Sequence, residues 1–289
     1  MYPASFEYHR ASSVKQAVGL LAQHGDDAKL LAGGHSLIPL MKLRLAQPGH
    51  LVDIGRIPGL SGIRVEKGAV VIGALTTHEY VASSPAARQS LPVLAEAAGS
   101  IGDQQVRNCG TIGGSLAHAD PAADWPALAL ALDARITAVG PAGKRAIAAD
   151  EFFVDLLTTA LRPDEMLTEV RFPIPPAGSG AAYAKHVHPA SRFAVCGVAA
   201  LLVPGSGGTC KDVRVAVTGV GPKATRAGAV EHSLDGKKPV ADAIAAAAAR
   251  AADGIEMSAD LQGSVEYKQH LTCVCARKAL ERAAGAMKA

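Results

Sequence analysis

Leu-Ala-Gly-Gly-His-Ser at residues 31–36 and Thr-Ile-Gly-Gly-Ser at residues 111–115 are the two stretches that decide which fold and ligand this sequence predicts. Each glycine pair lies where an apolar, strand-like run meets a polar or helical one. A Gly-Gly pair followed by serine leaves backbone N–H groups uncovered by side chains, so that they can point at a phosphate. One such loop is common in ordinary turns. Two loops of matching design predict a ligand with two phosphates that is held from both sides, and a dinucleotide is the expected ligand.

The composition is that of a globular protein with several domains. The 289 residues are enough for two or three compact domains, and 49% of them are hydrophobic and 19% charged. A net charge of +3 and an aromatic content of 4% argue against a nucleic-acid partner or an anionic membrane surface. Residues 1–8 lack the basic start and apolar core of a signal peptide, and the alanine-rich run 241–252 is too short and polar to cross a bilayer. We therefore expect a cytoplasmic protein with no direct membrane insertion, peripheral at a membrane only through its partners.

The cysteines do not form a recognisable framework. They are odd in number and scattered, at positions 109, 196, 210, 273 and 275. Such a set is not typical of disulfide-bonded domains, and iron–sulfur or zinc sites need repeated short cysteine spacings that this chain does not supply. We expect no metal bound by this chain itself.

Hydrophobic periodicity predicts a β-α-β-α-β unit in the first 60 residues. Ser12 or Ser13 can cap the first helix, whose apolar positions follow a 3.6-residue period, and Gly25 can stop it. The expected strands are 6–10, 29–32 and 51–54, and the second helix is 36–45.

The rest of the chain predicts two further α+β units. Between residues 61 and 175 we expect a hairpin, strands and helices; the expected ranges are 63–66 and 69–73 for the hairpin, 135–139 and 166–172 for strands, and 91–98 and 125–132 for helices, with a further short helix starting at Thr76 or Thr77. The Pro- and Gly-rich run 173–180 marks a linker. Three strands, 182–188, 196–203 and 213–220, and then helices near 227–234, 240–252 and 265–284 should form a three-stranded antiparallel sheet with helices. The predicted domains are 1–175, divided at about residue 60 into two subdomains (1–60 and 61–175), and 176–289.

The motifs resemble a known family. Lys29–Leu37 resembles the first FAD loop, and Val106–Asp124 the second, of the flavoprotein (medium) subunit of molybdenum hydroxylases, the carbon monoxide dehydrogenase and xanthine dehydrogenase group. The resemblance extends over nearly the whole chain, and the second loop with its trailing Asp-Pro-x-x-Asp is the more specific signal. It implies an α+β fold with a two-lobed FAD-binding domain of the vanillyl-alcohol-oxidase/PCMH type, a C-terminal α+β domain and noncovalent FAD.

The resemblance also assigns cofactor-binding residues, with no catalytic residue among them. The first loop would hold the pyrophosphate and flank the adenosine and ribityl portions, the second would contact the diphosphate, and further positions would lie near the adenine–ribose end or the flavin ring. The residues are Lys29, Leu30, Leu31, Ala32, Gly33, Gly34, His35, Ser36, Leu37, Ile101, Gly102, Thr111, Gly113, Gly114, Ser115, Ala117, His118, Asp124, Leu167, Lys185 and Phe193.

Several of these residues admit a second interpretation. His35 in a Gly-His pair raises covalent flavin attachment, although the resemblance implies noncovalent binding. His118 fits a local cap or turn as well as a flavin contact, and Asp124 can cap a helix that begins at Trp125. Whether Phe193 or a neighbour covers the flavin ring stays open.

The resemblance implies an electron-transfer function. The chain would take electrons from a [2Fe–2S] cluster on a small iron–sulfur subunit and pass them from FAD to a quinone, NAD or oxygen. A large subunit would hold the molybdopterin cofactor, and two such heterotrimers would form a dimer. The enzyme alternative is a self-contained FAD-dependent oxidoreductase with its own small-molecule substrate. The non-enzyme alternative is a scaffold subunit that has lost FAD, which the intact glycines and the serines of both loops argue against.

Overall fold

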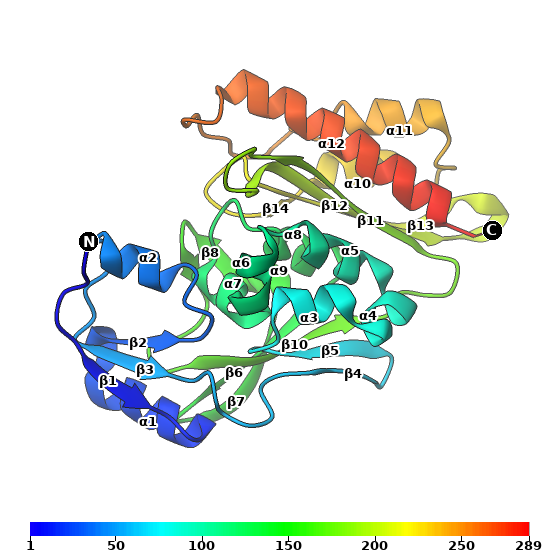
Figure 1. Ribbon diagram of the computed structural model, residues 1–289. Coiled ribbons are helices and arrows are strands. Elements are labelled where there is room, and N and C mark those ends of the chain that lie inside the picture. The colour runs from blue at the N-terminus through cyan, green and yellow to red at the C-terminus, as the bar shows by residue number, and fades with distance from the viewer. Residues whose placement is uncertain (289) are drawn as a thin grey trace.

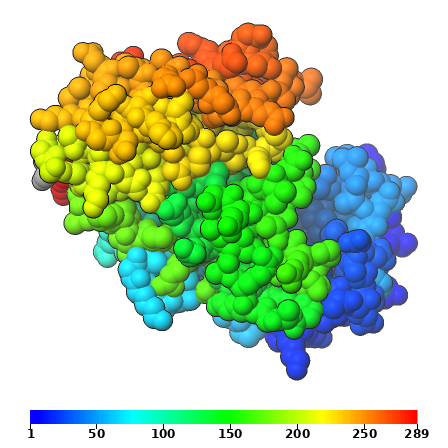
Figure 2. Space-filling view, turned by 180° about the vertical axis from the view of Figure 1, so that it is seen from behind, coloured from blue at the N-terminus to red at the C-terminus, as the bar shows by residue number. Residues whose placement is uncertain are grey.

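The computed structural model describes residues 1–288 and shows three packed regions. A small lobe at the N-terminus lies beside a central lobe, and a C-terminal region covers the other side of the central lobe (Figure 1). Seen from behind, the blue N-terminal lobe, the green central lobe and the yellow-to-orange C-terminal region form one continuous body (Figure 2). In residues 1–288 no helix is long and apolar enough to cross a membrane.

The N-terminal lobe is the predicted β-α-β-α-β unit. Its elements are β1 (Glu7–Arg10), α1 (Val14–His24), β2 (Ala28–Leu31), α2 (Leu37–Lys42) and β3 (His50–Asp53). The three strands are parallel in the order β1-β3-β2. Ser13 caps α1 by accepting a hydrogen bond from the backbone N–H of Gln16, and Gly25 ends the helix with a φ of +55°, a value that suits glycine. Because parallel strands present their carboxyl ends at one edge, the loop after β2 emerges beside the central lobe.

The central lobe is built on a five-stranded antiparallel sheet in the order β4-β5-β10-β6-β7. The strands are β4 (Ile63–Glu66), β5 (Ala69–Gly73), β6 (Arg135–Gly140), β7 (Gly143–Ala148) and β10 (Met166–Pro173), with a small hairpin of β8 (Phe153–Asp155) and β9 (Thr158–Thr159). The helices are α3 (His78–Ser83), α4 (Pro85–Ser90), α5 (Pro92–Ser100), α6 (Gln104–Cys109), α7 (Ile112–His118), α8 (Trp125–Ala131) and α9 (Ala149–Phe152). Strand β7 is not predicted from the sequence, because it is a mostly exposed edge strand without a clear apolar alternation.

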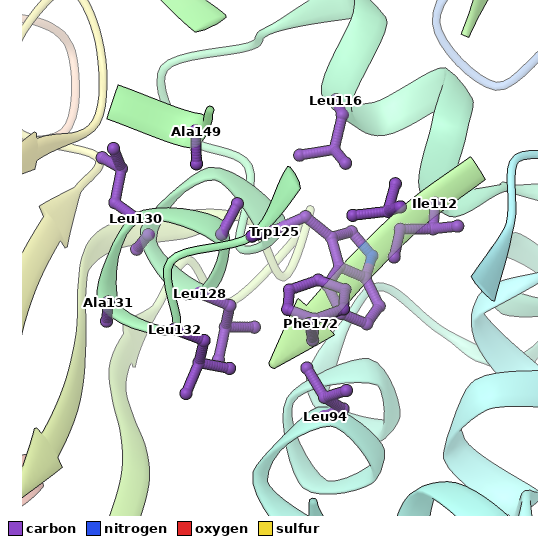
Figure 3. Packing of buried hydrophobic residues seen from close by; sticks show 14 of the residues in the cluster. Leu94, Ile112, Leu116, Trp125, Leu128, Leu130, Ala131, Leu132, Ala149 and Phe172 are labelled. Carbon is purple, nitrogen blue, oxygen red and sulfur yellow. The ribbon is translucent and has the colours of Figure 1, made fainter. Parts of the chain in front are cut away.

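Trp125 organises the core of the central lobe. Its indole is fully buried among Leu94, Ile112, Leu116 and Phe172, which come from α5, α7 and β10 (Figure 3). Large aromatic side chains contribute most to a core when they are buried in this way, roughly 3 kcal/mol or more each. The core therefore fixes the position of α7, whose first turn borders the cavity described below.

The C-terminal region is a four-stranded antiparallel sheet with three helices. Its elements are β11 (Gly180–Val187), β12 (Ala194–Pro204), β13 (Cys210–Thr218), β14 (Thr225–Arg226), α10 (Gly228–Leu234), α11 (Ala241–Ala248) and α12 (Val265–Ala286). The three predicted strands are present, and the two-residue β14 adds a fourth at the edge. Helix α12 packs on β11 and β12, and the opposite face of the sheet packs against α8 and α5. The sheet is thus buried on both faces and joined to the central lobe.

Candidate functional site

One cavity, of about 400 Å³, is lined by residues from all three regions. The N-terminal lobe contributes the loop after β2, the central lobe contributes α6, α7 and the segment after α7, and the C-terminal region contributes a turn between β11 and β12. This volume lies in the range of cofactor sites, roughly 300–1,000 Å³. The three regions therefore border one site at their meeting point.

The loop after β2 offers a row of backbone donors to this cavity. Within residues 1–288, the backbone N–H groups of residues 33–37 have no protein acceptor. The His35 ring folds back so that its Nδ1 lies 2.9 Å from the Gly33 carbonyl oxygen, which holds the loop in shape. Successive free N–H groups before a helix are a binding site for an anion, because they carry partial positive charge. The first glycine pair thus has the geometry that its sequence predicts.

Gly33 is required where this loop meets the central lobe. A Cβ atom added at Gly33 would overlap the carbonyl oxygen of Cys109, the last residue of α6. The added Cβ would also lie only 3.0 Å from the Cα of the next residue, Gly110. Only glycine lets the two lobes approach this closely, and the approach closes one end of the cavity.

The second glycine pair works differently from the prediction. It is not a loop but the first turn of α7, and all of the backbone N–H groups in this turn already have protein acceptors. The acceptors for residues 112–115 are Thr76 O (3.1 Å), Ala74 O (2.9 Å), Thr111 Oγ1 (3.1 Å) and Thr111 O (3.0 Å), in chain order. This glycine pair instead lets α7 lie close to the segment after β5, because a Cβ at Gly113 would lie only 2.6 Å from the Cβ and the carbonyl oxygen of Ala74. The free donors to the cavity therefore come from the first motif, while the second supplies a close helix and the hydroxyls of its flanks.

The structure brings most of the predicted residues to the cavity wall. The predicted residues that line the cavity are Lys29, Leu30, Ala32, Gly33, Gly34, His35, Ser36, Leu37, Ile101, Gly102, Thr111, Gly113, Gly114, Ser115, Ala117, His118, Asp124, Leu167 and Phe193. Leu31 and Lys185 do not line it. The carbonyl of Leu31 instead accepts a hydrogen bond from the backbone N–H of Ile54, inside the sheet.

Lys185 lies behind the cavity wall in a buried ion pair with Asp124. Its Nζ is 2.9 Å from Asp124 Oδ1 and 3.0 Å from Oδ2, and it also donates to the carbonyl oxygen of Ser100 at 3.2 Å. Tyr183 donates its hydroxyl proton to Asp124 Oδ1 at 2.5 Å. The Asp124 carboxylate therefore accepts hydrogen bonds from two side chains of β11. It forms no capping hydrogen bond to the first turn of α8. Burial raises the pKa of Asp124, an effect that Lys185 and Tyr183 oppose. A direct contact of Lys185 with a cofactor stays a prediction.

Residues outside the predicted set complete the cavity wall, and some of them lie within or beside the motifs quoted from the sequence. The additional lining residues are Leu40, Ile54, Ala74, Leu75, His78, Val106, Gly110, Asp120, Ala123, Ser191 and Arg192. Most are apolar residues without a distinctive local pattern. Ser191, Arg192 and the predicted Phe193 belong to a tight turn after β11 in which the backbone N–H of Arg192 donates to the carbonyl of His188 at 2.8 Å. This turn carries the half-exposed Phe193 ring over the cavity from the C-terminal region.

His78 is a buried polar residue of the cavity wall. Trp125 donates its indole N–H to Nδ1 of His78 at 3.1 Å, so the proton of the neutral ring resides on Nε2. Burial, which has the largest effect, and the nearby His35 and Arg107 together lower the pKa of His78 to about 4. His78 is therefore a neutral N–H donor at neutral pH.

We expect His78 to make the protein sensitive to acid. The pKa of His78 is lower in the folded protein than its ordinary value of about 6.5, because the buried ring resists protonation. The contribution of neutral His78 to the free energy of unfolding is therefore fully present above pH 6.5. As the pH falls towards 4 this contribution is lost, by up to roughly 3 kcal/mol. Gln at this position keeps an acceptor for Trp125 and does not titrate. Denaturant unfolding at pH 7 and pH 4.5 should show a smaller acid loss in His78→Gln than in the wild type, with the exposed His270→Gln as the control. An equal acid loss in wild type and His78→Gln would contradict this role.

Comparisons with known proteins agree with this architecture. Residues 4–175 match the family "FAD binding domain in molybdopterin dehydrogenase", and residues 181–283 match "CO dehydrogenase flavoprotein C-terminal domain". The chain is 46% identical to the carbon monoxide dehydrogenase medium chain of Hydrogenophaga pseudoflava, over 98% of both chains. It is 41% identical to the 6-hydroxypseudooxynicotine dehydrogenase complex subunit alpha of Paenarthrobacter nicotinovorans, over 98% of this chain and 96% of the relative.

The similarity extends to solved structures. A chain of the carbon monoxide dehydrogenase from Hydrogenophaga pseudoflava superimposes with a TM-score of 0.96 at 47% identity and full coverage of both chains. A chain of quinoline 2-oxidoreductase from Pseudomonas putida 86 gives a TM-score of 0.93 at 32% identity, again with full coverage. Both family models and these relatives cover nearly all of this sequence. The chain therefore belongs to the family of FAD-binding medium subunits of molybdenum hydroxylases.

Proposed function

We propose that this chain is the electron-transfer subunit of a molybdenum hydroxylase, which receives electrons from a [2Fe–2S] partner subunit and delivers them from FAD to a terminal acceptor. The observation that carries the proposal is the cavity at the junction of the three regions, with its row of free backbone donors in a chain of this family. The acceptor can be a quinone, NAD or oxygen. A large subunit with the molybdopterin cofactor would oxidise the substrate, which this chain would not contact.

The donors of the first loop fit the pyrophosphate of FAD. A pyrophosphate carries about two negative charges, and each exposed helix-start donor contributes on the order of 0.3–1 kcal/mol, more when partly buried. The free N–H groups of residues 33–37 meet this need with backbone donors of one short segment. The absence of a side chain at Gly33 keeps the cradle open, because a Cβ would push it away from α6.

The rest of the wall fits the apolar parts of the same cofactor. Ile54, Leu75, Ile101 and Leu167 line the cavity between its polar loops. FAD supplies the redox chemistry when it is bound, and the chain supplies orientation and exclusion of water. The Phe193 turn of the C-terminal region would cover one side of the bound group. In this proposal His35 stabilises the conformation of the loop, because its Nδ1 forms a hydrogen bond with the Gly33 carbonyl oxygen. FAD is bound noncovalently.

Subunit assembly is a further part of the proposal. The names of the two relatives describe a medium chain of carbon monoxide dehydrogenase and subunit alpha of a dehydrogenase complex. A small iron–sulfur subunit, a large molybdopterin subunit and a dimer of such heterotrimers come from the family resemblance. A cytoplasmic location is part of the same proposal. Residues 1–175 are proposed as the cofactor-binding domain, with a boundary between its two subdomains near residue 60, and residues 176–289 as the second domain.

Isolation from the native host with all bound partners tests this function. We expect flavin bands together with iron–sulfur absorption and two further subunits, because the electrons must enter from a partner. The FAD-loaded chain alone should accept electrons from a reduced iron–sulfur partner and should not oxidise the substrates of the complex. A single flavin-containing chain that turns over a small molecule by itself would support the self-contained oxidoreductase and contradict the proposal.

A further inference from the structure

Three of the ten histidines converge in the N-terminal lobe, away from the cavity. His9 lies in β1, His24 is the last residue of α1, and His50 begins β3. Each offers one ring nitrogen to a group in which all three nitrogens lie within 4.8 Å of one another. None of the three lines the cavity described above.

The local fold brings them together for a definite reason. The register of the parallel pair sets Glu7 beside His50 and His9 beside Val52. Because alternate residues of a strand share a face, Glu7, His9 and His50 point to the same side as Val52. Val52 packs in one buried cluster with residues of α1, so this face is the one that α1 covers, and α1 ends with His24.

The three rings meet at close range. Nε2 of His9 is 3.0 Å from Nδ1 of His50, and the His24 ring stacks on the His50 ring with centroids 3.6 Å apart and planes inclined by 27°. Nitrogen ligands of a tetrahedral zinc ion, each about 2.0–2.1 Å from the metal, lie roughly 3.4 Å from one another. Small rotations of the side chains would therefore aim three imidazole lone pairs at one ion.

Two carboxylates complete the surroundings of the cluster. Glu7 Oε2 lies 3.5 Å from Nδ1 of His50 and 3.8 Å from Nε2 of His9, on the side where a fourth ligand would stand. Asp27 Oδ2 lies 4.0 Å from the other nitrogen of His50, Nε2. A carboxylate behind a metal-binding histidine fixes which ring nitrogen is free to coordinate. Asp27 is itself anchored, because its Oδ1 accepts a hydrogen bond from the backbone N–H of Gly49 at 2.7 Å.

Gly49 preserves this arrangement. A Cβ at Gly49 would overlap the carboxylate of Asp27. The side chains of His9 and His50 are 25% and 18% exposed, so the cluster is held in place and is still open to an ion from solvent. The site lies at the amino-terminal edge of the parallel strands, where His50 pairs with Ala28, whereas the glycine loop follows the opposite edge.

We propose that His9, His24 and His50, with Glu7 as the fourth ligand, bind one divalent transition-metal ion such as Zn²⁺. Imidazole nitrogens with one carboxylate suit Zn²⁺, Co²⁺ or Ni²⁺, whereas Mg²⁺ and Ca²⁺ require oxygen ligands. The ion ties β1, α1 and β3 together. It acts on the N-terminal lobe and takes no part in the redox site.

Metal titration of the full-length chain, free of any affinity tag and stripped of metal, tests the proposal. Isothermal titration with Zn²⁺ should show one equivalent bound per chain, Co²⁺ should give the visible absorption of a tetrahedral complex, and Mg²⁺ should show no binding. His50→Ala and His24→Gln should each weaken Zn²⁺ binding at least tenfold, and Asp27→Asn by about tenfold, because the Asp27 carboxylate orients the His50 ring from its Nε2 side. His270→Ala, at an exposed histidine of α12, is the matched control and should bind as the wild type does.

The outcomes separate this site from the flavin site. Absence of saturable Zn²⁺ binding, or equal binding in the wild type, His50→Ala and His24→Gln, would overturn the proposal and leave three imidazole rings that only pack against one another. His24→Gln at the end of α1 guards against loss of folding in His50→Ala, and far-UV circular dichroism checks both. The FAD content of the chain should be the same with and without Zn²⁺, so this result does not depend on the proposed redox function.

Discussion

Gly33→Ala is expected to abolish stable FAD binding. The new methyl group would overlap the carbonyl oxygen of Cys109, so the first loop must move away from α6. Its free backbone N–H groups then no longer point together at the phosphates of the cofactor. A hydrogen bond to a charged group is worth roughly 1.5–3 kcal/mol, and the loss of two such bonds weakens binding on the order of 100-fold or more. The ratio of flavin to protein absorbance after purification and a fluorescence titration with FAD measure the effect.

Gly19→Ala is the matched control for this substitution. Gly19 lies inside α1 with no atom within 4 Å of an added Cβ, so alanine there should raise helix stability by up to about 1 kcal/mol and leave FAD binding unchanged. Thermal unfolding distinguishes a displaced loop from a misfolded chain. A folded Gly33→Ala protein that retains wild-type FAD content would show that the close approach to Cys109 is not needed for binding.

The two glycine motifs show how far sequence reasoning reaches. Around Gly33 the local pattern is sufficient, because a strand, a turn and a helix start follow one another and the free donors belong to the same short segment. Around Gly113 it is not sufficient. The N–H of Gly113 is taken by the carbonyl of Ala74, thirty-nine positions earlier in the chain, and no local pattern predicts that partner.

The same distinction separates the predicted from the unpredicted site residues. Residues within the two motifs reach the cavity because their neighbours in sequence are also neighbours in space. His78 gives no signal in the sequence, since its importance comes from the indole of Trp125 forty-seven positions away. Asp124 looks like a helix cap in the sequence, yet Tyr183 and Lys185 from a strand of the C-terminal region take its carboxylate. Many elements were predictable from periodicity, whereas β7, the helical turn at the second glycine pair and the contacts between the three regions were not.

Lys185→Met should destabilise the protein by about 3–5 kcal/mol, the usual loss when one partner of a buried ion pair is removed. The side chains of Lys185 and Asp124 are only 6% and 4% exposed, so solvent cannot take over the role of the ammonium group. The midpoint of thermal unfolding should fall by roughly 5–10 °C. The exposed pair of Arg277 and Glu281 in α12 offers the control, because Arg277→Met should cost less than about 1 kcal/mol.

The pH dependence of the Lys185→Met variant identifies the cause of this loss. Burial already raises the pKa of Asp124, and without the ammonium group it rises further, so the folded variant binds a proton that the unfolded chain releases near pH 4. The contribution of Asp124 to the stability of the variant, taken as the difference from the Asp124→Asn/Lys185→Met double variant, should therefore be most favourable below pH 4 and fall as the pH rises towards the folded pKa. Asp124→Asn combined with Lys185→Met removes the buried charge and should restore part of the stability at pH 7. If the single variant shows the same pH profile as the double variant, the loss arises from packing of the lysine stem at the junction of the central lobe with β11, and the buried charge is not its cause.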